Sequence, residues 1–78
     1  MKINSIGPIN KVQWPFVAKR LSEIGETWGD GDSFLEYNPF KKFPKLNLIS
    51  LFRDGRGLSF QEGGGAEVSV EEFLREKI

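Results

Sequence analysis

The strongest constraint on the fold of this 78-residue chain is one apolar run that ends in a tight turn. Residues 46–53 are mostly apolar, with Pro44 before them and Asp54-Gly55 after them. Glycine accepts the positive φ values that a tight hairpin turn needs, and residues 58–61 then alternate between apolar and polar side chains. We therefore predict an antiparallel hairpin of two strands, 46–53 and 58–61.

A helix is predicted before this hairpin, over about residues 11–24. Asn10 and Gln13 form a capping box, in which each side chain can bond the backbone N–H of the other residue. Gly25 supplies the left-handed residue that ends many helices, and Pro15 fits only in the first turn, so the regular helix is expected to begin near Gln13. The apolar face of this helix consists of Trp14, Val17, Leu21 and Ile24.

A second helix is predicted after the glycines at 63–65. Ser69 and Glu72 form its capping box. Its apolar face consists of Val70, Phe73, Leu74 and Ile78. A short strand is also predicted over residues 34–37, and Pro39 is expected to end it.

A first strand is predicted at Ile3 and Ile6, ended by Gly7-Pro8. The fold class that follows is α+β, a single domain over residues 1–78. It has a small antiparallel sheet of three to four strands, with two helices on one face of the sheet.

The chain has no cysteine and no histidine. It therefore has no disulfides and no thiolate metal sites, which is typical of a reducing cytoplasm, and it lacks the commonest general base and metal ligand. We expect a protein that is not an enzyme and has no cofactor. Uncharged runs such as 3–10 and 46–52 are too short for a membrane helix, and no signal peptide follows Lys2. A cytoplasmic location without membrane contact is expected.

Asp30, Asp32 and Glu36 have the spacing of three ligands in a calcium-binding loop. That loop also needs glycine at its sixth position and glutamate at its twelfth, where this chain has Leu35 and Lys41. A lysine in the last position would oppose the cation. We interpret the segment as a solvated acidic loop and predict no metal site.

The net charge of zero hides a segregation of charge along the chain. Residues 1–22 carry +4 and residues 23–36 carry −5. Residues 37–60 carry +4, and the remaining residues carry −3. A chain with as many acids as bases lacks the long positive surface that a duplex binder needs, so no duplex nucleic acid is expected as a partner.

The second basic segment alternates cations with aromatic rings, which is what a nucleotide needs: ammonium against phosphate and ring against base. Trp28, in a loop rich in glycine, fits a stacking surface better than a core. Whether the rings of Phe40 and Phe43 lie on the surface or in the core is left open. The predicted ligand-binding residues are Trp28, Tyr37, Phe40, Lys41, Lys42, Lys45, Arg53 and Arg56.

The layout of a helix closing at residues 21–25, a hairpin at Asp54-Gly55 and a final helix over 68–74 resembles small accessory proteins of bacteriophages. The resemblance implies a counter-defence factor in the host cell cytoplasm. Some such proteins are sponges that sequester cyclic nucleotide or ADP-ribose-type immune signals, usually as oligomers, and others block a host defence protein. The resemblance transfers no functional residue to this chain.

Three functions follow as hypotheses. The first is a non-enzymatic, oligomeric binding protein that sequesters a small anionic nucleotide signal. The second is an inhibitor of a host defence protein, with the acidic segment 23–36 facing a basic partner. The third is binding of single-stranded nucleic acid along residues 37–56.

A homo-oligomer is also predicted, because the strand 46–53 is apolar on both faces. Leu46, Leu48 and Phe52 share one face, and Ile49 and Leu51 share the other. Two helices on one side of the sheet would leave one set exposed, which favours association. We expect Ile49 or Leu51 at or near the interface.

Overall fold

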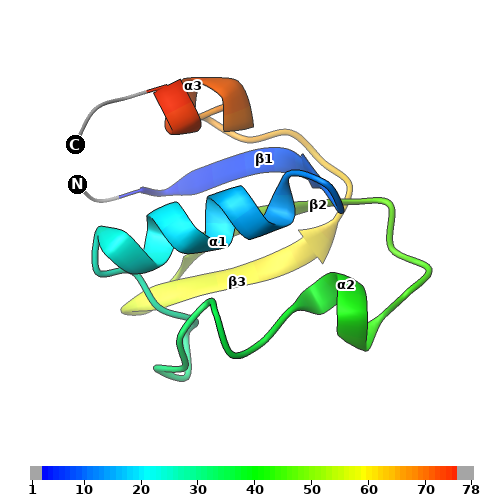
Figure 1. Cartoon of the computed structure of the whole chain (residues 1–78). Helices are drawn as coiled ribbons and strands as arrows, with labels where there is room; N and C mark the ends of the chain where they lie inside the picture. The colour runs from blue at the N-terminus through cyan, green and yellow to red at the C-terminus, as the bar shows by residue number, and fades with distance from the viewer. Residues whose placement is uncertain (1–2, 76–78) are drawn as a thin grey trace.

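Three strands form one antiparallel sheet in the order β1-β2-β3 in the computed structural model, which describes residues 3–75 (Figure 1). The strands are β1 (Ser5–Asn10), β2 (Leu48–Asp54) and β3 (Gly57–Glu62). The sheet and the short helices beside it confirm the predicted α+β fold class with a small antiparallel sheet.

Helix α1 (Trp14–Glu23) lies across one face of the sheet (Figure 1). Helix α3 (Val70–Arg75) lies beside β1 and contacts both β1 and α1, while the short α2 (Pro39–Lys42) lies on the side of β3. Both predicted helices are therefore present, α1 over the sheet and α3 at its edge. Ile78, predicted for the face of the last helix, lies outside the described residues.

The predicted hairpin is confirmed. Asp54 pairs with Gly57, and Gly55, at φ 66°, supplies the positive φ of the two-residue turn. Gly57 has a second role, because a Cβ at this position would collide with the backbone carbonyl of Trp28. The hairpin can therefore pack directly against the loop that follows α1.

The predicted capping box forms around the turn that precedes α1. The N–H of Asn10 donates to Oε1 of Gln13 at 3.0 Å, and the N–H of Gln13 donates to Oδ1 of Asn10 at 2.7 Å. Residues 11–13 form turns, so the regular helix begins at Trp14, with Pro15 in its first turn as expected. Gly25, at φ 85°, ends the helix.

The first strand does not end at Gly7-Pro8, so that prediction was wrong. Ile6 lies opposite Leu51 and Ile9 opposite Ile49, which leaves one extra residue on β1 and makes a bulge. The bulge keeps Ile6 and Ile9 on the same buried face although they are three positions apart. Pro8 is exposed within the bulge, where a missing N–H costs no ladder bond.

The strand predicted over residues 34–37 is also wrong, because this segment is a turn. The N–H of Glu36 donates to the carbonyl of Ser33 at 3.1 Å, and the N–H of Leu35 donates to its hydroxyl at 3.1 Å. A serine that bonds its own neighbouring backbone competes with strand pairing. Asn38 then caps α2 by accepting a bond from the N–H of Phe40 at 2.9 Å.

Ile49 and Leu51 are both fully buried in the core of a single chain, so the expectation that one of them is left exposed for contact with a second subunit was wrong. They belong to the same core cluster as Trp14, Val17 and Leu21 of α1. On the other face of β2, Ser50 is buried because its hydroxyl donates to the carbonyls of Gly63 and Gly64, at 2.7 and 3.1 Å. The segment after β3 therefore covers part of the face that was expected to be free.

Candidate functional site

The predicted ligand-binding residues do not share one surface. Trp28 and Phe40 are only 6% and 3% exposed and belong to the core. The prediction of Trp28 as an exposed stacking surface was therefore wrong. The N–H of Gly29 donates to the carbonyl of Leu58 at 3.0 Å, and the N–H of Leu58 donates to that of Thr27 at 2.9 Å. These bonds hold the loop against the edge of β3 and bring the indole into the core.

Trp28 packs within a cluster of rings. Its ring centroid lies 4.5 Å from that of Phe34 and 5.9 Å from that of Trp14. Phe40 also contacts this cluster, with its ring centroid 6.2 Å from that of Trp14. The alternative that was left open for Phe40 is thus decided in favour of the core. Phe43, in contrast, is 47% exposed.

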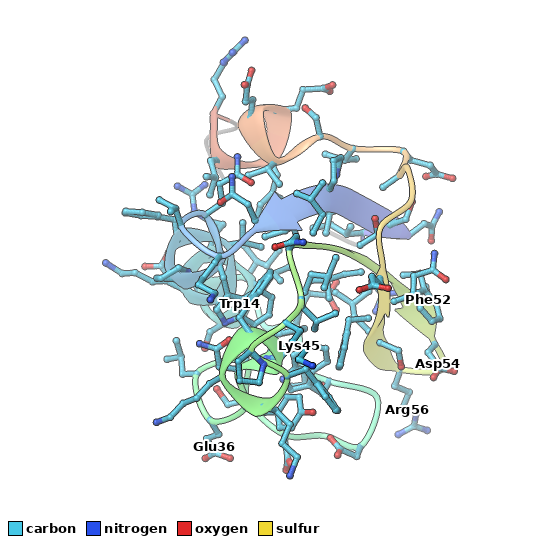
Figure 2. The ribbon with its side chains drawn as sticks, turned by 90° about the vertical axis from the view of Figure 1, so that its right-hand side faces the viewer. Trp14, Glu36, Lys45, Phe52, Asp54 and Arg56 are labelled. Carbon is cyan, nitrogen blue, oxygen red and sulfur yellow. The ribbon has the colours of Figure 1, made fainter. Side chains whose placement is uncertain are left out.

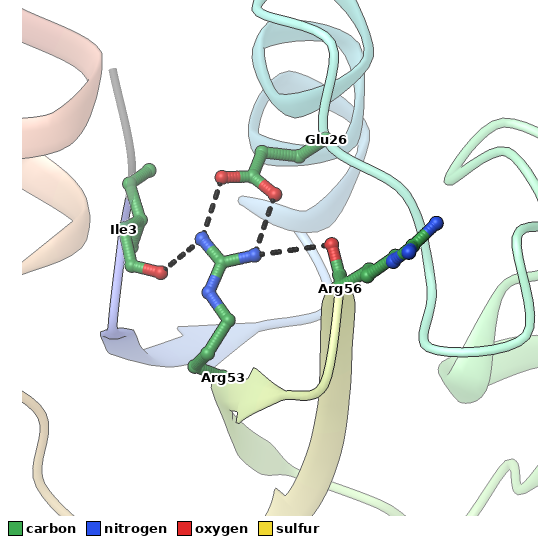
Figure 3. A network of polar contacts seen from close by, with 4 residues as sticks. All are labelled: Ile3, Glu26, Arg53 and Arg56. Carbon is green, nitrogen blue, oxygen red and sulfur yellow. Dashed lines mark hydrogen bonds and ion pairs between the residues drawn. The ribbon is translucent and has the colours of Figure 1, made fainter.

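Arg53 is held in an ion pair and is not a free cation for phosphate, which corrects its predicted role. Its Nη1 and Nη2 donate to the two carboxylate oxygens of Glu26 at 3.0 and 2.7 Å. Figure 3 shows the same guanidinium between the carbonyl oxygens of Ile3 and Arg56, to which it also donates. The side chains of Arg53 and Glu26 are 17% and 9% exposed, so the pair is largely withdrawn from water.

The ion pair shifts the titration of both groups. The hydrogen bonds from Arg53 lower the pKa of the Glu26 carboxyl, against the opposing effect of burial. The same bonds raise the pKa of Arg53. The pair joins residues 27 positions apart, and no local spacing in the sequence signals it.

The remaining predicted cations are exposed: Lys41, Lys42, Lys45 and Arg56. The three lysines lie on or just after α2, whereas Arg56 lies in the hairpin turn; Figure 2 shows Lys45 and Arg56 on different parts of the molecule. The predicted cations are therefore split between two places, and the predicted rings lie mainly beneath the surface.

The structure instead forms a hollow of about 690 Å³ beside the hairpin turn, between β3 and the loop after α1. It is lined by Trp28, Gly29, Asp30, Asp32, Tyr37, Asp54, Gly55, Leu58, Ser59 and Phe60. We call it the acidic aromatic hollow, because three aspartates and three aromatic residues contribute to it. Among the described residues, no lysine or arginine lines it.

The aromatic side of the hollow is a set of rings in mutual contact. The ring of Trp28 lies nearly perpendicular to that of Tyr37, at 88° and 5.6 Å between centroids. It meets the ring of Phe60 at 70° and 5.8 Å. Tyr37 and Phe60 are half-buried, so part of each ring remains at the surface.

The carboxylates of the hollow are exposed, and two of them are oriented by hydrogen bonds. Oδ2 of Asp54 accepts a bond from the hydroxyl of Ser59 at 2.8 Å. Oδ1 of Asp30 accepts a bond from the backbone N–H of Asp32 at 3.1 Å. Carboxylates attract cations, and aromatic faces favour them as well. The hollow is suited to a positively charged group with an apolar stem, and it repels phosphate.

Sequence reasoning missed this hollow. Asp30 and Asp32 were interpreted as a solvated loop, and Asp54 only as a turn residue. They meet because Trp28 and Leu58 form an isolated bridge between the loop and β3. Gly57, whose missing side chain allows this approach, was the available signal. Within residues 3–75, no group of acidic residues is arranged to hold a metal ion.

Over the part of the chain that the structure describes, no helix is both long and apolar enough to cross a membrane. A scan against protein-family models found no match, and searches of curated proteins and of solved structures found none either. The candidate site therefore rests on the geometry of this chain alone.

Proposed function

We propose that this chain is a non-enzymatic binding protein whose acidic aromatic hollow binds a positively charged segment of a partner protein. The observation that supports this most is the lining of the hollow. Three carboxylates and three rings contribute to it, while no cation among the described residues does. This corresponds to the second hypothesis from the sequence, an inhibitor that presents acidic groups to a basic partner.

A lysine or arginine side chain matches both parts of the hollow. Its aliphatic stem can pack against Tyr37 and Phe60, and its charged end can meet the carboxylates. Each exposed charge pair contributes only about 0.2–1 kcal/mol, so a partner needs several cations or a well-packed anchor residue. The exposed acids Asp30, Asp32 and Glu36 also favour fast encounter with a basic surface at low salt.

The biological part of the proposal comes from the sequence resemblance to small phage accessory proteins. In that setting the partner is a host defence protein, and binding would block it in the host cytoplasm. The geometry of the hollow bears on the chemistry of the partner and not on its origin.

Nucleotide or single-strand binding is a second candidate, and it belongs to a different surface. Phe43 is 47% exposed and lies next to Lys42 and close to Lys45 in the chain. An exposed ring beside cations can stack on a base. Lys41 lies beside Lys42 on α2. This candidate therefore requires Lys41, Lys42 and Lys45.

Calorimetry at low salt separates the two candidates. The probes are a lysine-rich and an arginine-rich decapeptide, a glutamate-rich decapeptide, and a panel of cyclic dinucleotides. The basic peptides should bind, and binding should weaken as salt rises. The double variant Asp30→Asn/Asp32→Asn keeps both side-chain shapes and should bind the basic peptides several-fold more weakly. Glu71→Gln, an exposed acid on α3, should bind as the parent does.

Two results would refute the proposal: no binding of either basic peptide at low salt, or binding that the Asp30 and Asp32 substitutions leave unchanged. Binding of a cyclic dinucleotide that is lost in Lys41→Glu/Lys42→Glu would support the second candidate instead.

A further inference from the structure

We propose that the outward face of α1 binds the acidic aromatic hollow of a second copy of this chain, so that the protein self-associates head to tail. The inference goes beyond the proposed function, since it concerns a second surface and a second occupant. Self-association uses the same hollow as the proposed basic partner, and the experiment separates self-association from partner binding.

The outward face of α1 is apolar and basic. Val12 and Phe16 are 77% and 63% exposed, in the turn before α1 and in its first helical turn. Lys11, which precedes Val12, and Lys19, three positions after Phe16, are also exposed. We call these four residues the basic apolar face. Two large apolar side chains at this exposure, four positions apart at the start of α1, are typical of a contact surface.

The chain segment that carries this face adds positive charge, whereas α3, which contacts α1, carries the exposed acids Glu71 and Glu72. Residues 1–22 contain no acid. The nearest acid on α1 is Glu23, and its carboxylate lies 3.7 Å from Nε of Arg20, which offsets its charge. A groove of about 400 Å³ beside Phe16 is lined by Phe16, Lys19, Arg20, Glu23 and Leu74. The face therefore offers an aromatic ring with a lysine three positions away, set beside a groove.

The hollow and the basic apolar face have complementary chemistry. The hollow offers carboxylates beside ring surfaces, and the face offers ammonium groups beside a phenyl ring. A volume of about 690 Å³ lies within the range of about 300–1,000 Å³ that pockets for sizeable ligands have, so a phenyl ring and a lysine can enter together. Phe16 does not line the hollow of its own chain, so a second copy must supply it.

The net charge of zero allows this contact. Two copies with a large charge of one sign would repel each other over long range, whereas two copies with segregated and balanced charge attract through opposite faces. The two surfaces differ, so the contact is heterologous and produces a ring or an open chain rather than a two-fold dimer. The contact also occupies the hollow, and it would therefore compete with a basic partner.

A pair of variants that each remove one surface tests the inference. Phe16→Glu removes the basic apolar face and leaves the hollow intact, and Asp32→Lys does the reverse. Both positions are exposed, so the fold should persist, which circular dichroism checks. Leu48→Glu is the matched control, because Leu48 is 42% exposed and belongs to neither surface.

Sedimentation at low salt and high micromolar concentration gives the readout. The parent and Leu48→Glu should sediment above the 8.9 kDa of one chain and dissociate at high salt. Each surface variant alone should weaken association about tenfold or more, equivalent to 1.4 kcal/mol or more. An equimolar mixture of the two should form a dimer and stop there, because one intact face and one intact hollow remain.

A monomeric parent under these conditions overturns the inference. So does association that survives both substitutions, or a mixture that fails to form the dimer. The proposed function is tested separately with the lysine-rich decapeptide, which Phe16→Glu should bind at least as tightly as the parent. Self-association without any peptide binding would refute the proposed function and leave the inference standing.

Discussion

Replacing Arg53 by methionine should destabilise the fold strongly, because the side chain joins three separate segments. Its guanidinium donates to the carboxylate of Glu26 in the loop after α1, to the carbonyl of Ile3 at the start of the chain, and to that of Arg56 in the hairpin turn (Figure 3). Arg53→Met keeps most of the buried stem and removes every one of these bonds. Glu26 is left as a largely buried carboxylate without its cation.

The size of the effect follows from the burial of the pair. Removing one partner of a buried ion pair costs about 3–5 kcal/mol. Arg53 is 17% exposed, and its Nε is buried without a partner among the described residues, so we take the lower end, about 3 kcal/mol. At about 0.05–0.15 kcal/mol per residue, 78 residues give a total of about 4–12 kcal/mol. The substitution would remove about a quarter of this stability or more.

Urea denaturation at neutral pH measures the effect. With a slope near 1 kcal/mol per molar, the midpoint of Arg53→Met should fall by about 3 M. The double variant Glu26→Gln/Arg53→Met should be more stable than the single variant, because it leaves no unpaired buried charge. Two results would show that the pair does not stabilise the fold as argued. One is a decrease in the urea midpoint of less than about 1 M, and the other is a double variant that loses as much stability as the two single variants together.

Three further predictions concern stability. The lowered pKa of Glu26 means that its contribution is complete above the ordinary value of 4.5 and is lost as the pH falls through the lowered folded value; urea midpoints from pH 7 to pH 3 should therefore fall less in Glu26→Gln than in the parent. Gly57→Ala should destabilise the fold by about 2 kcal/mol or more, because the new Cβ would collide with the backbone of the adjoining loop. Gly65→Ala places no atom within 4 Å of the new Cβ, so its free energy of unfolding in the same urea assay should stay within about 0.5 kcal/mol of the parent's. Phe34→Ala, at a position 1% exposed, should cost about 3–5 kcal/mol by thermal or chemical unfolding, while Leu35→Ala, 66% exposed, should change little, and equal losses would contradict the burial described.

The parts of the fold that were predicted from the sequence are those that depend on neighbouring residues. Asn10 and Gln13 bond each other three positions apart, and Gly55 turns the hairpin within two residues. Such features need no knowledge of the rest of the chain. The bulge at Gly7-Pro8 was missed because a bulge is defined by the register with the partner strand, which the sequence of β1 alone does not show. The extra residue lets Ile6 and Ile9 both face the core.

The site was harder to predict because its residues come from distant parts of the chain. Trp28 lies among glycines, which favoured a surface position. The contact that buries it depends on Gly57 and Leu58, about 30 positions later. The same contact brings Asp54 to the loop of Asp30. A hollow made in this way has no spacing that a single segment could reveal.

The acidic segment 23–36 shows why a run of like charge in a sequence does not define one surface. Glu26 turns inward and pairs with Arg53, where its charge stabilises the junction of three segments. Asp30 and Asp32 turn outward and line the hollow, where their charge is available to a cation. The neighbouring basic segment divides in the same way, since Arg53 is used within the fold while the lysines near α2 stay exposed. Glu26 and Arg53 are thus used for stability. The exposed acids of the hollow and the exposed lysines near α1 and α2 are therefore the charges on which binding to another protein, or to another copy, would depend.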